Sequence, residues 1–176
     1  VTSQIGCLAM SPSKSYFKVA VLTLSNSKRL ANDDSGKYIR NSIRSAYCLL
    51  EHQHVKDDVY QMRAVLSRWI ANSKINVIIT TGGTGFGQCD ITPDAIEPLL
   101  DKKIDGFGEL FREISYQIIG AKTIQSRCIA GIANDTLIFC LPSSLNACKT
   151  AWEGIISTQL DENAQECNFL RQLSVS

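Results

Sequence analysis

The chain has 176 residues, of which 44% are hydrophobic and 20% charged, and its formal net charge is +1. These values are ordinary for one compact domain, which at this length buries roughly 70% of its unfolded surface. The near-neutral charge disfavours nucleic acid and membrane surfaces as partners. No stretch has the pattern of a secretory leader or the length of a membrane span, so we expect cytoplasmic residence.

Seven cysteines are scattered along the chain without any Cys-x-x-Cys pair. Their odd number and irregular spacing argue against a disulfide framework and against a zinc site, so we expect reduced thiols. Residues 1–15 are expected to form a loosely ordered N-terminal arm. Residues 16–176 are expected to form a single domain.

Expected strands and helices alternate along the chain. β-Branched apolar runs indicate the strands, and apolar residues spaced three or four apart indicate the helices. In chain order the expected elements are a strand at 19–25, a helix at 34–46 with capping residues Asp34 to Gly36, a weaker strand near 48–55, a helix at 59–73, a strand at 76–81, helices at 92–100 and 106–120, a strand at 136–141 and a helix at 144–160. This alternation predicts an α/β fold, a three-layer domain with a mostly parallel central sheet flanked by helices.

The most informative segment is a glycine-rich turn that joins the strand at 76–81 to a helix beginning at Thr92. Its residues Gly82, Gly83, Thr84 and Gly85 allow backbone amides to approach and cradle an anion. The spacing does not match a Walker loop, because no Gly-Lys-Ser/Thr sequence follows, and Gln88 stands where a dinucleotide loop needs its third glycine. The alternative is a turn that needs positive φ only for its own geometry.

Polar residues follow three of the expected strands. In an open parallel sheet, ligands bind beyond the carboxyl ends of the strands, so these residues should border one crevice. They are Ser25 and Asn26 after the first strand, Gly82 to Asp90 after the middle strand, and Pro142, Ser143 and Ser144 after the last.

Two carboxylates near this crevice, Asp57 and Asp90, are candidate Mg²⁺ ligands, because Mg²⁺ in phosphoryl chemistry is held by carboxylates and phosphate oxygens. The alternatives are a solvated turn residue for Asp90 and a residue that favours the helix N-terminus for Asp57. His52 and His54 alternate along the weaker strand and could bind a metal. The sequence offers no third ligand nearby, so an exposed strand edge is the expectation for the pair.

Several motifs together resemble a known family, the molybdopterin adenylyltransferases, which include the gephyrin G domain. The resemblance spans about Lys18 to Phe169. It rests on Leu22 to Asn26, Asp33 to Gly36, Thr81 to Gly85, Asp90 to Ala95, Gly106 to Arg112, Gln125 to Arg127, Ala130 and Gly131, Asn134, Thr136 to Phe139, Ala147 to Trp152, and Cys167 to Phe169.

The resemblance implies a molybdopterin-binding α/β fold whose members transfer an adenylyl group from Mg-ATP to molybdopterin and release pyrophosphate. It also implies homo-oligomers, either trimers or hexamers. By position it implies catalytic, Mg²⁺-binding roles for Asp57 and Asp90. It further implies that the pterin and nucleotide contact Ser25, Gly82, Gly83, Thr84, Gly85, Ser126, Pro142, Ser143 and Ser144.

The chain departs from the family pattern at two places. Ser143 stands where the family usually has glycine, and Gln88-Cys89 stands where an arginine often precedes the aspartate. Serine at this position would either bear strain at positive φ or relax to negative φ with weaker phosphate binding. These departures leave open a non-catalytic molybdopterin-binding or assembly protein of the same fold. An interaction scaffold without a pterin ligand is the third alternative, against which the glycine loop and the polar strand ends argue.

Overall fold

The computed structural model describes residues 17–24, 33–161 and 168–169. The expected N-terminal arm, Ser25 and Asn26 lie outside the described residues. In the described part of the chain no helix has both the length and the apolar character needed to cross a membrane.

A six-stranded sheet forms the centre of the molecule, with the strand order β2-β1-β3-β6-β5-β4. The strands are β1 (Lys18–Leu24), β2 (Cys48–Val55), β3 (Val77–Thr81), β4 (Lys102–Lys103), β5 (Ile129–Ala133) and β6 (Thr136–Leu141). β2, β1, β3 and β6 are parallel, whereas β5 is antiparallel to β6 and β4 is antiparallel to β5. The expected mostly parallel sheet is therefore confirmed, and the two antiparallel strands at one edge are additional.

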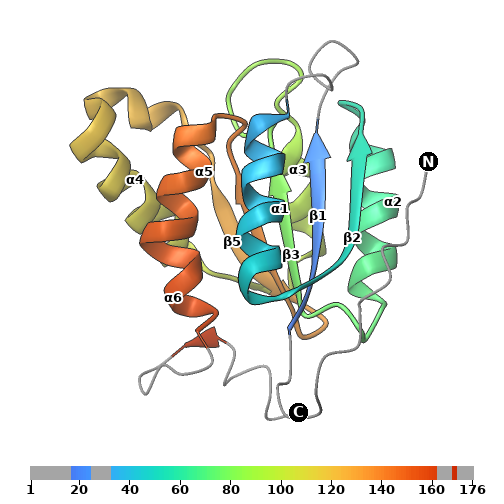
Figure 1. Cartoon of the computed structure of the whole chain (residues 1–176). Coiled ribbons are helices and arrows are strands. Elements are labelled where there is room, and N and C mark those ends of the chain that lie inside the picture. Colours follow the sequence, from blue (N-terminus) through green and yellow to red (C-terminus); the bar gives the residue numbers. More distant parts are fainter. Residues whose placement is uncertain (1–16, 25–32, 162–167, 170–176) are drawn as a thin grey trace.

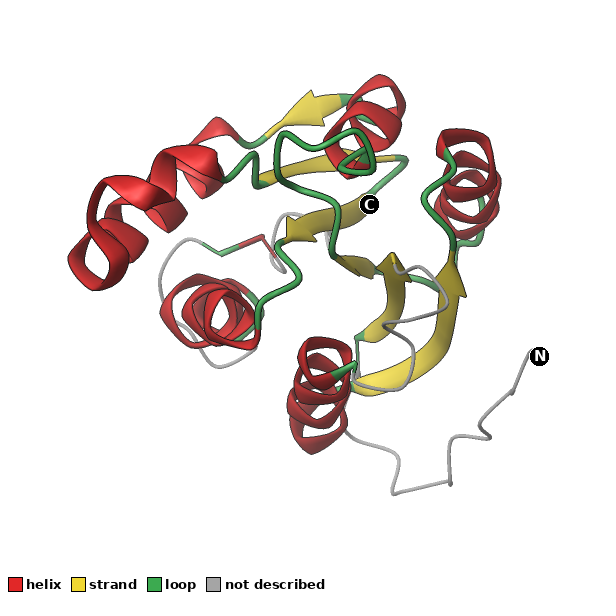
Figure 2. Cartoon of the chain, turned by 90° about the horizontal axis from the view of Figure 1, so that it is seen from above, coloured by secondary structure: helices red, strands yellow, loops and turns green. Residues whose placement is uncertain are grey.

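Helices cover both faces of this sheet, which gives three layers (Figures 1 and 2). The helices are α1 (Asp34–Ala46), α2 (Val59–Ile70), α3 (Thr92–Ile96), α4 (Asp105–Ile119), α5 (Leu145–Ala151) and α6 (Ser157–Gln159). Short 3₁₀ turns follow α3 (η2, Glu97–Leu99) and α4 (η3, Gly120–Gln125), and a π-helical turn at Trp152–Ile156 joins α5 to α6. One face of the sheet is covered by α1, α4 and α5, and the other by α2 and α3.

The period-two alternation of the central strands separates two hydrophobic cores. Val19 and Val21 of β1 belong to the buried cluster that contains Ile39 and Ile43 of α1. Ala20 and Leu22, on the opposite face, belong to the cluster that contains Met62 and Leu66 of α2. Because β1 is buried on both faces, its sequence is a continuous apolar run, as expected for a central strand of a parallel sheet.

Carboxylate side chains cap the N-termini of α1 and α2. Asp33, rather than the expected Asp34, caps α1, and its side chain accepts a hydrogen bond of 2.9 Å from the Gly36 N–H. Asp58 caps α2 by accepting hydrogen bonds from Tyr60 N–H (2.8 Å) and Gln61 N–H (2.9 Å). These caps satisfy amides that have no partner within the helix, and so they fix where each helix begins.

The order of the strands reverses between β1 and β3. From β1 the chain passes to β2 on one side, and it then returns to place β3 on the other side. In open α/β sheets, ligands bind at the carboxyl ends of the strands on either side of such a reversal. The glycine-rich loop follows β3 at this edge, so the topology places it where a ligand site is expected.

Candidate functional site

A cavity of about 430 Å³ opens beside the carboxyl ends of β3 and β6. Its lining includes most of the residues expected from the sequence, namely Gly83, Thr84, Gly85, Asp90, Ser126, Pro142, Ser143 and Ser144. Gly82 directly precedes this set, and Asp57 is not part of the lining. The tertiary structure thus brings together residues that lie up to 61 positions apart in the chain, by the difference between residues 83 and 144.

Two glycines at the start of the loop have backbone conformations that other residues rarely adopt. φ is +98° at Gly82 and +67° at Gly83. The Gly82 N–H donates to the Leu141 carbonyl (2.9 Å), and Thr92 donates its hydroxyl to the Gly82 carbonyl (2.7 Å) and its N–H to the Gly83 carbonyl (2.9 Å). These hydrogen bonds tie the turn to β6 and to the start of α3. The need for glycine therefore comes first from the turn itself, while Gly83 also lines the cavity.

The rest of the loop wraps around the carboxylate of Asp90. Oδ2 of Asp90 accepts a hydrogen bond of 2.8 Å from the Gly87 N–H. A Cβ atom added to Gly85 would lie 2.7 Å from the same oxygen, so glycine is needed there for close approach. Among the described residues, none donates a hydrogen bond to Oδ1 of Asp90. The carboxylate is thus held in place by one oxygen and offers the other to a ligand.

Arg127 holds the glycine loop from outside the cavity. Its guanidinium donates to the carbonyl of Gly85 (2.8 Å), to the carbonyl of Asp90 and to both carboxylate oxygens of Asp94 (3.2 and 3.1 Å). It also lies over the Phe86 ring, 5.3 Å from the ring centroid. Sequence reasoning gave Arg127 no role, although the Gln125-Ser126-Arg127 motif was the available signal. A planar, fixed set of donors suits this role because one side chain can restrain several loop atoms.

The far wall of the cavity comes from α4 and η3, which sequence reasoning did not connect with the site. Phe111, Ile118 and Ile119 supply apolar surface, and Lys122 supplies a positive charge. Gln88-Cys89 stands where the family resemblance implies an arginine, which would supply a positive charge beside Asp90. Lys122 provides a cation at the cavity from a different element.

The Pro142-Ser143-Ser144 turn has no strained residue. Asn134 and Asp135 are the two described residues other than glycine with positive φ, so Ser143 lies at negative φ. Of the two alternatives drawn from the sequence, strain at Ser143 is therefore wrong, while weaker phosphate binding at this turn stays a prediction. Ser144 caps α5, and its side chain accepts a 3.3 Å hydrogen bond from the Ala147 N–H.

Asp57 lies between β2 and α2, in the residue before the Asp58 cap. β1 separates β2 from β3, so their ends are about 10 Å apart at the usual strand spacing. Asp57 therefore follows a strand on one side of β1, and the glycine loop that contains Asp90 follows a strand on the other side.

Two buried thiols, those of Cys128 and Cys148, are not ionised at neutral pH. Burial raises the pKa of Cys128 to about 12, and it does the same for Cys148. The Ser126 hydroxyl donates to the Cys128 sulfur at 3.1 Å. Because a thiolate is the nucleophilic form, these two cysteines serve packing rather than covalent chemistry.

Comparison with known proteins connects this geometry to one family. The family described as a probable molybdopterin binding domain matches residues 20–162. The chain is 46% identical to molybdenum cofactor biosynthesis protein B of Escherichia coli strain K12 over 153 residues, which cover 86% of this chain and 90% of that protein. It is 41% identical to the protein of the same name from Staphylococcus epidermidis over 155 residues, covering 85% and 88% of the two chains.

Solved structures give the same result. A crystal structure of a molybdenum cofactor biosynthesis protein B superposes with a TM-score of 0.83 at 28% identity, covering 94% of this chain and all of that one. The tungsten cofactor synthesizing protein MoaB from Pyrococcus furiosus superposes with a TM-score of 0.74 at 36% identity, covering 82% and 93% of the two chains.

Proposed function

The chain belongs to the molybdopterin-binding domain family, and from this premise we propose that it acts in molybdenum cofactor biosynthesis. The proposed reaction is adenylyl transfer, in which the terminal phosphate of molybdopterin attacks the α-phosphorus of ATP and pyrophosphate leaves. The observation that carries the proposal is the cavity, where the glycine loop, Asp90 and an apolar wall meet at the strand ends. This combination suits a ligand with a flat ring at one end and a phosphate at the other.

The cavity divides into surfaces of different chemistry. Phe111, Ile118 and Ile119 form the apolar side, against which we propose that the pterin ring packs. Thr84, Ser126 and Lys122 supply hydroxyl donors and a positive charge for the phosphate. No covalent intermediate with the protein is required, since the chain contributes positioning and charge neutralisation.

Asp90 suits Mg²⁺ because Mg²⁺ prefers carboxylate oxygens and Oδ1 is not hydrogen-bonded to the described residues. Asp57 is the proposed second acidic residue, and it follows β2, which β1 separates from β3. When bound, Mg²⁺ would neutralise charge on the transferred phosphoryl group. Gly87 holds the Asp90 carboxylate in place, and Arg127 holds the Asp90 carbonyl.

A second candidate function has one observation in its favour. Of the two proposed acidic residues, Asp90 lines the cavity and Asp57 does not. The same fold with a single carboxylate at the ligand would suit a molybdopterin-binding or assembly protein without turnover. Activity and binding must therefore be measured separately.

The test is conversion of molybdopterin and Mg-ATP to adenylylated molybdopterin and pyrophosphate by the purified full chain. We expect Asp90→Asn to lower turnover by about a hundredfold or more, as for the loss of other groups that stabilise transition-state charge. An amide oxygen can still accept the Gly87 hydrogen bond, so the loop should keep its shape. Molybdopterin binding should change much less than turnover.

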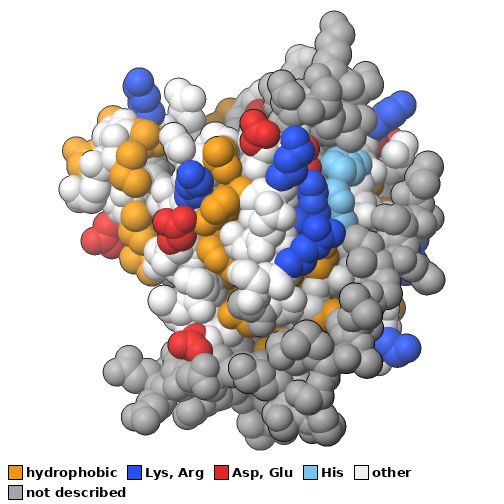
Figure 3. All heavy atoms as spheres, viewed as in Figure 1, with side chains coloured by type: hydrophobic (Ala, Val, Ile, Leu, Met, Phe, Trp, Pro, Cys, Tyr) orange, Lys and Arg blue, Asp and Glu red, His pale blue; other side chains and the backbone are white. Residues whose placement is uncertain are grey.

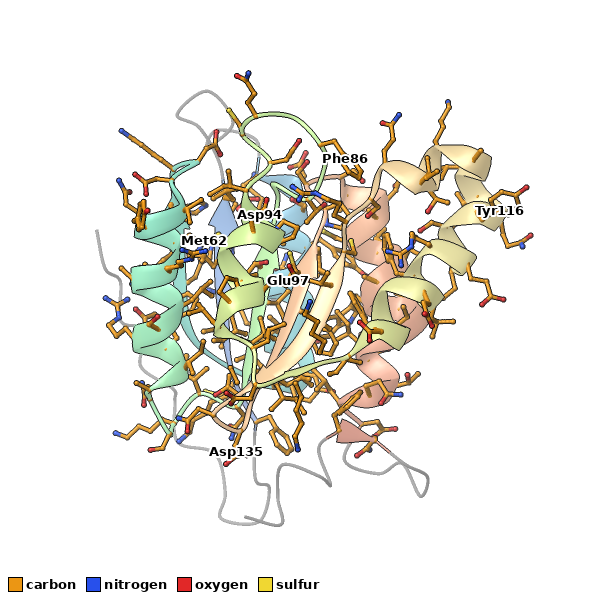
Figure 4. The ribbon with its side chains drawn as sticks, turned by 180° about the vertical axis from the view of Figure 1, so that it is seen from behind. Met62, Phe86, Asp94, Glu97, Tyr116 and Asp135 are labelled. Atoms are coloured by element: carbon orange, nitrogen blue, oxygen red, sulfur yellow. The ribbon has the colours of Figure 1, made fainter. Side chains whose placement is uncertain are left out.

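Asp135→Asn is the matched control, because Asp135 lies at the opposite end of the molecule from the glycine loop (Figure 4). It should leave both turnover and binding unchanged. A wild-type chain that binds molybdopterin but releases no pyrophosphate would establish the non-catalytic alternative. A chain that binds neither molybdopterin nor ATP would overturn both functions.

A further inference from the structure

Three side chains with metal-binding atoms converge at the ends of β1 and β2, on the face covered by α1. Ligand atoms of Asp33, His52 and His54 all lie within 4.8 Å of one another, and this is the single group of three in the described parts of the chain. His54 Nε2 is 3.3 Å from Asp33 Oδ2. The expectation of no third ligand beside the two histidines is therefore wrong. Asp33 lies 21 residues before His54 and comes close only in the folded chain.

The fold explains why these groups meet. His52 and His54 are two residues apart on β2, so both side chains lie on one face of the sheet. They pair with Val21 and Thr23 of β1, and Val21 faces the α1 side of the sheet. Asp33 caps α1, whose N-terminus lies over the same strand ends. Each of the three residues is thus positioned by a helix or a strand.

Arg40 of α1 already places a positive charge among these atoms. Its Nη1 lies 3.1 Å from Asp33 Oδ2 and 3.1 Å from His52 Nε2. A guanidinium can only donate hydrogen bonds, so His52 Nε2 is the acceptor and bears a lone pair. The proton of a neutral His52 is therefore on Nδ1, and the lone pair points toward the cluster. This is the tautomer that an Nε2 metal ligand requires.

We propose that Asp33, His52 and His54 form a binding site for a divalent transition metal, with Zn²⁺ the best match, and that Arg40 is the cation that competes for these ligands. Two imidazoles and one carboxylate are a common zinc ligand set and leave a fourth position for water. Ligands bound at about 2.0 Å in a tetrahedron lie about 3.3 Å apart, which equals the separation of His54 Nε2 and Asp33 Oδ2.

The site is open to solvent and independent of the cavity. The His54 side chain is 32% exposed and the Arg40 side chain 17% exposed, so both reach solvent. Figure 3 shows the histidine side chains at the surface beside basic side chains. None of the three proposed ligands lines the cavity, so the proposal does not depend on the proposed function.

The test is calorimetric titration of the chelator-treated full chain with Zn²⁺, together with the absorption spectrum of the Co²⁺-loaded protein. We expect one equivalent to bind, with a Co²⁺ spectrum that lacks thiolate charge-transfer bands. Asp33→Asn, His52→Gln and His54→Gln should each weaken binding by about tenfold or more. Asp33→Asn retains helix-capping ability, and His54→Gln alters an exposed side chain, so loss of binding in these variants would not reflect loss of the fold.

Arg40→Gln separates the competing cation from the ligands. It should tighten Zn²⁺ binding by about tenfold, since it removes a positive charge that lies in contact with two ligands. Arg44→Gln, one turn further along the same helix, should change the affinity by less than about threefold. Equal Zn²⁺ affinity in the wild-type chain and both histidine variants would overturn the site, as would a thiolate spectrum. Unchanged affinity in Arg40→Gln would overturn the competition.

Discussion

At the scale of single residues, the turn at Gly83 leaves no room for a side chain. A Cβ atom at Gly83 would lie 2.5 Å from Thr92 Oγ1 and would overlap the Leu24 side chain, and φ there is +67°. Both neighbours belong to the scaffold rather than to the cavity. A substitution at Gly83 should therefore damage folding and not only ligand binding.

We predict that Gly83→Ala lowers the free energy of unfolding by about 2 to 5 kcal/mol, from a backbone cost of about 1 to 2 and an overpacking cost of about 1 to 3. Denaturant unfolding would measure the change. Gly106→Ala is the control, because a Cβ there meets nothing within 4 Å and the residue lies in the first turn of α4. Equal stability of the two variants would show that the turn tolerates a side chain.

His52 gives a prediction about pH. Burial, with the charges of Arg40 and His54, lowers its pKa from 6.5 to about 4, while the Asp33 charge opposes this shift and Arg44 adds to it. Between about pH 4 and pH 6.5, His52 is protonated in the unfolded chain and neutral in the folded chain. Stability contributed by neutral His52 is therefore fully present above pH 6.5 and is lost as the pH falls toward 4.

We expect the denaturant midpoint of the metal-free protein to fall over this range, and to fall less in His52→Gln. Burial would raise the pKa of Asp33, but the Gly36 N–H and the contacts with Arg40 and His54 outweigh it and lower the pKa below 3.8. The Asp33 contribution is thus lost at a lower pH than that of His52. Identical pH profiles for the wild-type chain and His52→Gln would contradict the assignment.

At the scale of elements, the glycine loop depends on a side chain from the segment that follows η3. Arg127 binds two loop carbonyls and the Asp94 carboxylate, and its N–H donates to the Thr84 carbonyl (2.9 Å). Arg127 thus restrains the loop at Thr84 and Gly85 and again at Asp90. Its shape is set by this connection as well as by its own glycines.

We predict that Arg127→Lys loosens the loop, because a lysine ammonium cannot reproduce the planar fork of donors. Amide hydrogen exchange at residues 84 to 90 should become faster, while the global unfolding free energy falls by only about 1 to 2 kcal/mol. Arg68→Lys is the matched control, since Arg68 pairs with Glu51 on an exposed surface. Unchanged exchange in Arg127→Lys would mean that the glycines alone hold the loop.

At the scale of the whole molecule, exposed apolar side chains gather on the outer part of α4 and on η3. Tyr116 is 57% exposed, Ile118 65%, Ile119 50% and Ile124 76%. Figure 4 shows Tyr116 on the outer part of α4, away from the centre of the sheet. Apolar surface of this kind is typical of interfaces between subunits. Tyr116 and Ile124, which do not line the cavity, best suit the homo-oligomer expected from the family resemblance.

We predict that light scattering gives a multiple of the 19.4 kDa chain mass for the wild type. Ile124→Glu should shift the mass toward that of the monomer, because it would bury a charge in an apolar interface. Tyr60→Glu on α2, where the side chain is 79% exposed, should leave the mass unchanged. A monomeric wild-type chain at micromolar concentration would refute the expectation of an oligomer.

The sequence by itself determined the features that depend on neighbouring residues. The strands β1, β3 and β6 are apolar runs because they are buried on both faces of the sheet. The glycine loop predicts positive φ values because backbone sterics exclude most other residues from them. The motifs along the chain also identified the family correctly. β5 was missed, since five residues containing Gly131 give little periodic signal, and β4 has only two residues.

Only the tertiary structure decided which of these local features meet. The order of the strands places β6 beside β3, so the glycine loop and the Pro142 turn share a cavity, while β1 separates the strand before Asp57 from the strand before the glycine loop. Packing brings Arg127 to a loop about 40 residues earlier in the chain and Asp33 to the two histidines. Such contacts depend on strand order and on how helices cover the sheet. No local pattern encodes them, because the free energy that fixes them comes from burying whole elements against one another.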